Sequence, residues 1–208
     1  MSSSSTLDRQ WFIVGRWQEY AGEGRANLVR VLALIAFYGV QLYRYRFVDE
    51  ANEATQLFQR QTTLIVVAWS LVALAVLVCL QRKIFPATLK YLSTLADVTL
   101  LTLLAQLGGG TQGALPQVYF LIIGLAALRC SVGLVWFASV ASMAGYWSLV
   151  GMQDTKWFDA DHSTPLVNQL VTLVSLALAG VIAGQVVRQT RSMAEDFAQR
   201  MKKIGGKR

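Results

Sequence analysis

Charged residues are scarce in this sequence of 208 residues. They make up 15% of the chain and hydrophobic residues make up 54%, whereas a soluble domain carries about 25% charged residues. Cysteine is scarce as well, because Cys79 and Cys130 are too few for a disulfide framework and form no CxxC pair. The low charge argues against a soluble domain, and the two cysteines fit small packing residues better than redox or metal groups.

The motifs of common catalytic centres are also missing. The sequence has no HExxH, GxSxG or Walker loop. An intramembrane protease needs two aspartates or a buried nucleophile and base, but only Asp97 lies inside an apolar run, and the single histidine, His162, lies in a connection. That connection also holds Asp154, Asp159 and Asp161, at spacings that match no closed metal site. We therefore expect a protein that is not an enzyme and binds neither a cofactor nor a metal.

What the sequence does contain is a series of apolar runs separated by short polar stretches. A bilayer core of about 30 Å needs about 20 apolar residues for each helical crossing, and membrane strands would alternate in polarity instead. The pattern predicts an all-α fold, a polytopic membrane helix bundle with about six transmembrane helices. These cover residues 26–43, 62–80, 89–107, 115–128, 132–151 and 165–187. The fourth is short, and whether it crosses the whole bilayer stays open.

The segment before the first apolar run has a different character. Residues 7–20 place Trp11 and Trp17 among Arg9 and Arg16, which predicts a short amphipathic helix lying in the membrane interface. A lid packed over the end of the bundle is the alternative. The chain then divides into an N-terminal interfacial segment (1–24), a six-helix transmembrane domain (25–187) and a cytoplasmic helical tail (188–208).

The 19 Lys and Arg residues are unevenly distributed. Most lie in the N-terminal segment, the second connection, the fourth connection and the tail, and few lie in the remaining connections. Because cytoplasmic connections carry the excess of Lys and Arg, both termini are predicted to be cytoplasmic. The net charge of +7 then matches anionic lipid, so we expect the lipid bilayer, and not a nucleic acid, as a partner.

Three ionisable residues lie inside or at the ends of predicted spans. Asp97 is in the third span, Arg129 closes the fourth, and Arg30 is near the start of the first. Each costs roughly 2.5–3.5 kcal/mol to insert, and all three are predicted to lie at the same depth. We therefore expect Asp97 to pair with Arg129 or Arg30, either as a structural ion pair that sets helix register or as a switch.

The connection after the third span is rich in glycine and uncharged. It includes Gly109, Gly110 and Gln112, with Gln106 before it and Tyr119 after it. One interpretation is a re-entrant loop in which these five residues form the mouth of a ligand pocket. The other is a tight turn, since glycine permits positive φ angles.

Small residues recur four positions apart in the last two spans. The pairs are Gly180 with Gly184 and Ala141 with Gly145, and this spacing lets helices approach closely. They are expected either to pack the helices of one chain together or to form the face of a homodimer.

The last apolar run continues into a charged segment with helical periodicity. Val187, Thr190, Ala194 and Phe197 fall on the a and d positions of a heptad, with charged residues between them. A continuous helix that leaves the membrane toward a cytoplasmic protein partner is the natural interpretation.

Four short motifs follow one another in the middle of the chain: LADVTLLTLL at 95–104, GGG at 108–110, YFL at 119–121 and AALR at 126–129. Together they resemble the membrane-sensor region of bacterial sensor histidine kinases, and the pattern is nearest to the six-helix input domain of the type IV pilus sensor kinase family. The resemblance spans residues 25–190. It implies a bundle of the bacterial inner membrane that passes a signal through its last helix to a cytoplasmic output domain, with residues 97–129 as the sensing core.

The 208 residues contain no phosphoacceptor-histidine helix, ATP-binding domain or cyclase domain, so the resemblance does not carry kinase or cyclase activity over. The leading hypothesis is a stand-alone signal-input domain that acts through a partner. A structural or accessory subunit of a larger membrane complex is the first alternative. A small transporter is the second alternative, and the scarcity of ionisable groups in the outer halves of the spans argues against it.

Overall fold

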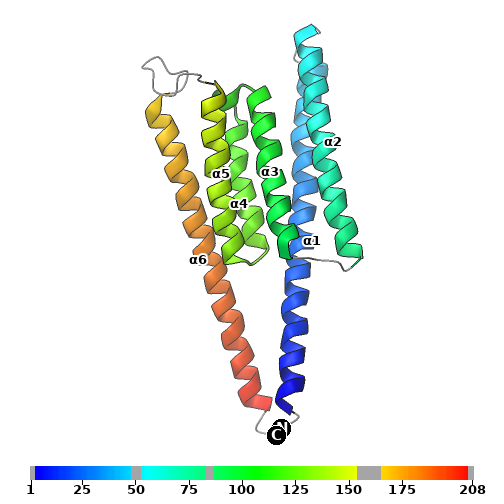
Figure 1. The fold of residues 1–208 in the computed structure, drawn as a ribbon, viewed down its shortest axis with the longest axis vertical. Coiled ribbons are helices and arrows are strands. Elements are labelled where there is room, and N and C mark those ends of the chain that lie inside the picture. The colour runs from blue at the N-terminus through cyan, green and yellow to red at the C-terminus, as the bar shows by residue number, and fades with distance from the viewer. Residues whose placement is uncertain (1–2, 48–52, 83–86, 154–164, 206–208) are drawn as a thin grey trace.

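The computed structural model describes residues 3–47, 53–82, 87–153 and 165–205. Within these ranges the fold is all-helical, which confirms the all-α part of the predicted fold class (Figure 1). The main helices are α1 (Ser3–Phe47), α2 (Glu53–Gln81), α3 (Ala87–Leu107), α4 (Val118–Leu128), α5 (Val132–Gln153) and α6 (Leu166–Gly205). Two short 3-10 helices, η1 (Gly110–Gln112) and η2 (Leu115–Gln117), connect α3 to α4.

Five helical segments are long and apolar enough to cross a membrane. They are Ala21–Phe47, Thr55–Gln81, Thr88–Leu107, Val132–Gln153 and Leu166–Ala194. The predicted fourth span corresponds to the shorter apolar segment Leu115–Leu128, which begins as η2 with Pro116 in its first turn and ends at Arg129. A multi-pass helical bundle therefore fits the chain, and a full sixth crossing stays a prediction.

The structure differs from the prediction at the N-terminal segment. Residues 7–20 do not form a separate interfacial helix, because α1 runs without a break from Ser3 to Phe47. The change from a charged to an apolar sequence near residue 25 therefore marks no change in the backbone. Gly22 and Gly24 stay helical, since a glycine inside a helix costs only about 1 kcal/mol. At the other end of the chain, α6 is also continuous across Val187.

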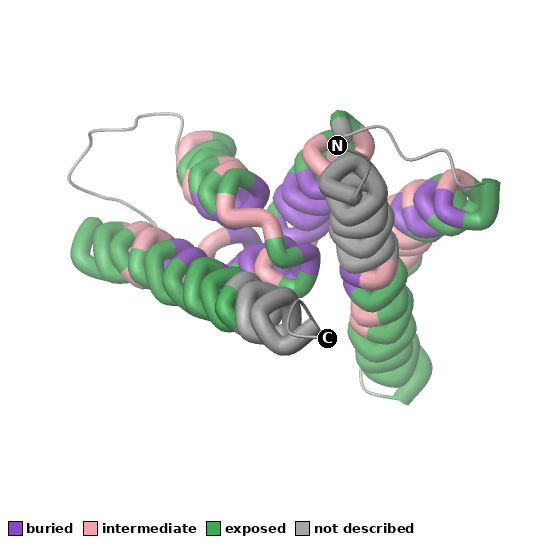
Figure 2. Tube along the Cα trace, turned by 90° about the horizontal axis from the view of Figure 1, so that it is seen from below, coloured by how far each residue is buried: buried purple, intermediate pink, exposed green. Residues whose placement is uncertain are grey.

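The bundle has its packed centre at α3, α4 and α5. Helix α5 contacts α3, α4 and α6, while α1 contacts α2 and α4, and α2 contacts α3. Figure 2 shows the buried residues on the sides of the helices that face one another, and the exposed residues on the outer sides. Many large apolar side chains lie on those outer sides, including Ile35, Leu64, Val167 and Ile182. Exposed apolar surface of this extent suits hydrocarbon better than water.

The two small-residue pairs lie at helix contacts within the chain. Gly180 is buried against Ser139 of α5, and Gly145 is buried against Thr102 and Tyr119, so that a Cβ atom at either glycine would overlap its neighbours. Gly184 is buried and Ala141 is half-buried, and Ala141 packs against the core. Packing within one chain therefore uses both pairs, and the homodimer alternative stays a prediction.

The two ends of the bundle differ. The end that holds the α4–α5 turn is termed the Arg129 end, and the end that holds η1 is termed the Gly110 end. Both α1 and α6 extend past the Arg129 end of the bundle (Figure 1). The residues of α1 before Ala21 and those of α6 after Ala194 lie beyond the apolar segments.

Candidate functional site at the Arg129 end

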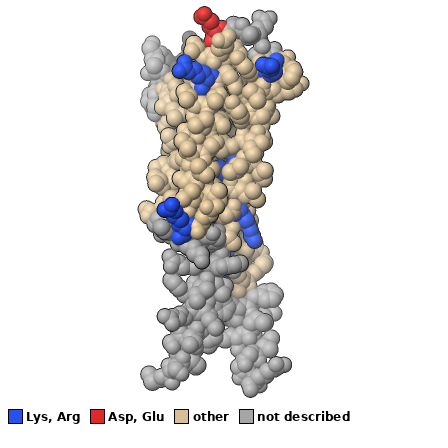
Figure 3. Space-filling model, turned by 90° about the vertical axis from the view of Figure 1, so that its right-hand side faces the viewer, with Lys and Arg blue, Asp and Glu red and all other residues tan. Residues whose placement is uncertain are grey.

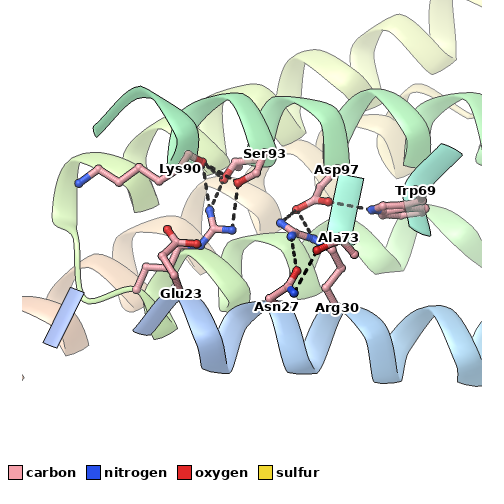
Figure 4. Close-up of polar contacts among 10 residues, drawn as sticks. Glu23, Asn27, Arg30, Trp69, Ala73, Lys90, Ser93 and Asp97 are labelled. Carbon is pink, nitrogen blue, oxygen red and sulfur yellow. Dashed lines mark hydrogen bonds and ion pairs between the residues drawn. The ribbon is translucent and has the colours of Figure 1, made fainter. Parts of the chain in front are cut away.

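A buried carboxylate joins the first three helices near the Arg129 end. Asp97 of α3 accepts hydrogen bonds from Arg30 of α1 through Nη2 (2.6 Å) and Nε (3.2 Å), both at Oδ2. Its other oxygen, Oδ1, accepts a 2.7 Å bond from Trp69 Nε1 of α2 (Figure 4). Asp97 and Arg30 are each 2% exposed. Both carboxylate oxygens are thus occupied by donors from two other helices.

A further bond extends this network along α1. Arg30 Nη1 donates to Asn27 Oδ1 at 2.9 Å, one turn back on the same helix, and Asn27 Nδ2 donates to the Ala73 carbonyl oxygen of α2 at 3.2 Å. Buried charge is tolerated when it is paired and its remaining donors are satisfied. The guanidinium of Arg30 meets both conditions.

A second buried ion pair lies closer to the helix ends. Arg129 Nε is 3.1 Å from Glu23 Oε2 of α1. The Nη1 group of Arg129 donates to the Lys90 carbonyl oxygen (3.0 Å) and to Thr94 Oγ1 (2.8 Å), and Nη2 donates to Ser93 Oγ (3.1 Å). A single side chain at the end of α4 therefore holds α1 on one side and the start of α3 on the other.

The backbone of the α4–α5 turn binds α6. Arg191 Nε of α6 donates a 2.7 Å hydrogen bond to the Cys130 carbonyl oxygen. Cys130 has a φ of 50°, a left-handed conformation that is uncommon for a residue other than glycine. The turn of Arg129 and Cys130 thus contacts α1, α3 and α6 at once.

Close packing of α1 on this turn depends on Gly22. A Cβ atom at Gly22 would lie 3.1 Å from the Leu128 carbonyl oxygen and 3.2 Å from the Arg129 Cα atom, both of which are backbone. Neither atom can rotate away as a side chain could. Gly22 therefore lets α1 cross the end of α4 at this short distance.

Gly22→Ala is expected to destabilise the bundle by about 1–3 kcal/mol, because α1 must move away from the turn. Gly24→Ala is the matched control, since nothing lies within 4 Å of a Cβ atom there and alanine is the better helix former by about 1 kcal/mol. The measurement is unfolding of both variants by SDS in dodecyl maltoside micelles, followed by circular dichroism. Equal effects of the two substitutions would contradict the close contact.

One of these pairs is predicted from the sequence, and the other is not. Asp97 pairs with Arg30, which was one of its two proposed partners, whereas Arg129 pairs with Glu23. Glu23 had been assigned to the segment before the bundle. Its spacing was a usable signal, because Glu23, Asn27 and Arg30 are polar residues at helical positions i, i+4 and i+7, on one face of α1.

The described residues among those predicted to form a pocket near η1 lie in different surroundings. Gln106 and Gly109 are exposed, and Gly110 is buried beside the side chain of Gln153. Tyr119 is fully buried, with its hydroxyl 2.7 Å from Thr102 Oγ1. The side chain of Gln112 lies outside the described residues.

The glycine-rich connection instead makes a turn held by Gln153 of α5. Gly109 and Gly110 adopt positive φ angles of 96° and 62°. Thr111 donates to Gln153 Oε1 from its backbone nitrogen (2.8 Å) and its hydroxyl (2.6 Å), and Gln153 Nε2 donates to the Gly109 carbonyl oxygen (3.3 Å). These contacts favour the tight-turn interpretation.

Within the described part of the chain, no group of three or more His, Cys, Asp or Glu residues is placed to hold a metal ion. The connection that contains His162 lies outside the described residues. Comparison with models of known protein families, with curated proteins and with solved structures gives no match for this chain. The likeness to sensor-kinase input domains therefore stays a prediction from the sequence motifs.

Proposed function

We propose that this chain is a signal-input module of the bacterial inner membrane, with both termini cytoplasmic and no catalytic centre of its own. In this proposal it acts on a protein partner through the helices that extend past the Arg129 end. The observation that supports it is the convergence of α1, α3 and α6 on the turn of Arg129 and Cys130.

The contacts at this turn suit transmission between helices. Arg129 forms an ion pair with Glu23 on α1 and donates hydrogen bonds to the start of α3, so a shift of either helix changes the contacts that Arg129 makes with the other. Arg191 passes such a shift to α6 through the Cys130 carbonyl oxygen. Packed helices with paired charges tend to switch between discrete arrangements instead of deforming gradually. A displacement within the bundle would thus reach the part of α6 that lies beyond the membrane.

The proposal is tested by photo-crosslinking of the full chain in its native membrane. A photoreactive amino acid is placed at Met193, which is 57% exposed on α6 near the Arg129 end, or at Val167, which is 69% exposed on the same helix at the Gly110 end. Capture of a kinase, cyclase or response regulator from Met193 but not from Val167 supports a signal-input module. Capture only of another copy of the chain, or of a large membrane assembly from both positions, would overturn it in favour of a structural subunit.

A further inference from the structure

A cavity of about 480 Å³ lies between α1 and α4 and is closed on its other sides by α2 and α3. It extends from Arg30 and Asp97 toward the Gly110 end, where Arg44, Leu107 and Gly108 line it. From Arg30 to Arg44 the stripe of α1 along the cavity is about 21 Å long, at 1.5 Å per residue. That exceeds the thickness of one leaflet of the hydrocarbon core, about 15 Å.

The middle of the cavity is apolar. Leu34 of α1, Leu101 and Leu104 of α3, and Ile122 and Leu125 of α4 line it. Protein interiors are close-packed, and a gap forfeits the dispersion contacts of the residues around it. Between helices that face a bilayer, the apolar group available to make those contacts is the acyl chain of a lipid.

The cavity is open toward the bilayer on the α1 side. Two of its lining residues, Phe37 and Val40, are 44% and 62% exposed. A lipid with two chains can therefore place one in the cavity and leave the other among its neighbours in the membrane. This opening favours a diacyl lipid over a ligand that must be enclosed completely.

A buried hydroxyl without a hydrogen-bond partner indicates where the polar part of a bound molecule lies. Thr62 of α2 lines the cavity, is 4% exposed, and has no hydrogen-bond partner for its Oγ1 atom among the described residues. An unsatisfied buried donor is costly, about 1–3 kcal/mol for a neutral group. The Tyr38 hydroxyl lies at the same level, 3.2 Å from Thr63 Oγ1. The ester carbonyl of a glycerolipid would satisfy the Thr62 hydroxyl at this position.

Basic side chains lie beyond Thr62, toward the Gly110 end of the cavity. Arg44 lines the Gly110 end of the cavity, and Arg46 and Arg60 are exposed near it, with Glu53 as the described acidic residue of that region. Figure 3 looks onto the α1–α2 side and shows basic side chains and one acidic side chain at its upper end, above a surface that is mostly uncharged. From Ile122 past Thr62 to Arg44, the lining changes from apolar to neutral polar to cationic. The acyl chain, ester and phosphate of a phospholipid have the same order.

We infer that the cavity between α1 and α4 is a binding site for one acyl chain of an anionic phospholipid, whose ester group lies at Thr62 and whose phosphate lies at Arg44. This inference is independent of the signalling role proposed above, because lipid binding can be measured without any output partner.

The test uses the full chain reconstituted in phosphatidylcholine vesicles that contain a trace of phosphatidylglycerol with a photoreactive acyl chain. After irradiation, the labelled residues are mapped by mass spectrometry. Labelling is expected at cavity residues such as Leu34 and Ile122. Ala33→Phe, which fills the cavity from α1, is expected to lower it about tenfold. Ala36→Phe, on the exposed side of the same helix, is the matched control and leaves it unchanged.

The headgroup is tested with a second pair of variants. Arg44→Gln removes a charge-assisted hydrogen bond and is expected to lower phosphatidylglycerol labelling about tenfold. Arg82→Gln removes the same charge from an exposed arginine that follows α2 at the Arg129 end and has little effect. Photoreactive phosphatidylcholine and a photoreactive C16 fatty acid are used in parallel. The inference is overturned by labels spread evenly over the outer faces of α1 and α6, by equal labelling with phosphatidylcholine, or by stronger labelling with the fatty acid.

Discussion

Replacing Arg30 with methionine is expected to destabilise the bundle by about 3–5 kcal/mol, because it leaves the buried carboxylate of Asp97 without its counter-charge. Trp69 Nε1 still donates to Asp97, but a single neutral donor does not compensate a carboxylate that is almost fully buried. Asn27 Oδ1 also loses the donor that it has in Arg30 Nη1. The change is measured as the shift of the SDS unfolding midpoint in dodecyl maltoside micelles.

A double-mutant cycle separates the loss of the pair from the loss of packing. Arg30→Met combined with Asp97→Asn removes both charges and keeps an oxygen that accepts from Trp69, so it is expected to recover most of the stability. Arg46→Met, on the exposed end of α1, is the control and should stay within about 0.5 kcal/mol of the parent. A double variant no more stable than Arg30→Met alone would show that the ion pair is not what stabilises this region.

The helices were predictable from hydropathy alone, because a run of about 20 apolar residues has few structures open to it in a bilayer. Continuity was not. The charged segment before residue 25 suggests a separate helix, yet α1 passes through it without a break, since backbone hydrogen bonding within a helix does not depend on the polarity of its side chains. The short fourth apolar run also has the predicted bounds, because it covers Leu115–Leu128.

The pairing of Arg129 with Glu23 could not be derived from hydropathy for a related reason. Depth in the membrane can be counted along each helix, but the rotation of a helix about its axis depends on close contacts such as that of Gly22 with the α4–α5 turn. The same holds for the cavity. Its walls come from residues as far apart in the chain as Leu34 and Ile122, and only the tilt of α1 relative to α4 decides whether they meet or leave a space.

The two buried arginines and the cavity are parts of one arrangement. Arg30 lines the cavity and bonds Asp97, while Glu23, two turns earlier on the same face of α1, holds Arg129. A molecule that moves α1 relative to α4 therefore acts on both ion pairs through a single rigid helix. In the proposed function, a molecule bound in the cavity would shift α1 and so change the contacts at the turn that binds α6.

Arg129→Met is expected to cost about 3–5 kcal/mol, because the carboxylate of Glu23 is then buried without a counter-charge. Its Oε1 atom already lacks a hydrogen-bond partner among the described residues, so the carboxylate has no other group to bind. Glu23→Gln is expected to cost less, about 1–3 kcal/mol, since Arg129 keeps its three hydrogen bonds to Lys90, Ser93 and Thr94. SDS unfolding gives both values, and a larger effect of Glu23→Gln would contradict this order.

The same variants test whether the turn positions α6. Spin labels at Arg25 of α1 and Arg188 of α6, which are both exposed, report the distance between the two helices near the Arg129 end. Arg129→Met is expected to broaden that distance distribution. Arg191→Gln removes only the bond to the Cys130 carbonyl oxygen and should also broaden it, at a cost in stability of about 1 kcal/mol or less. An unchanged distribution in both variants would mean that the packing of α6 against α4 and α5 is enough to hold it, and that the polar turn does not link it to α1.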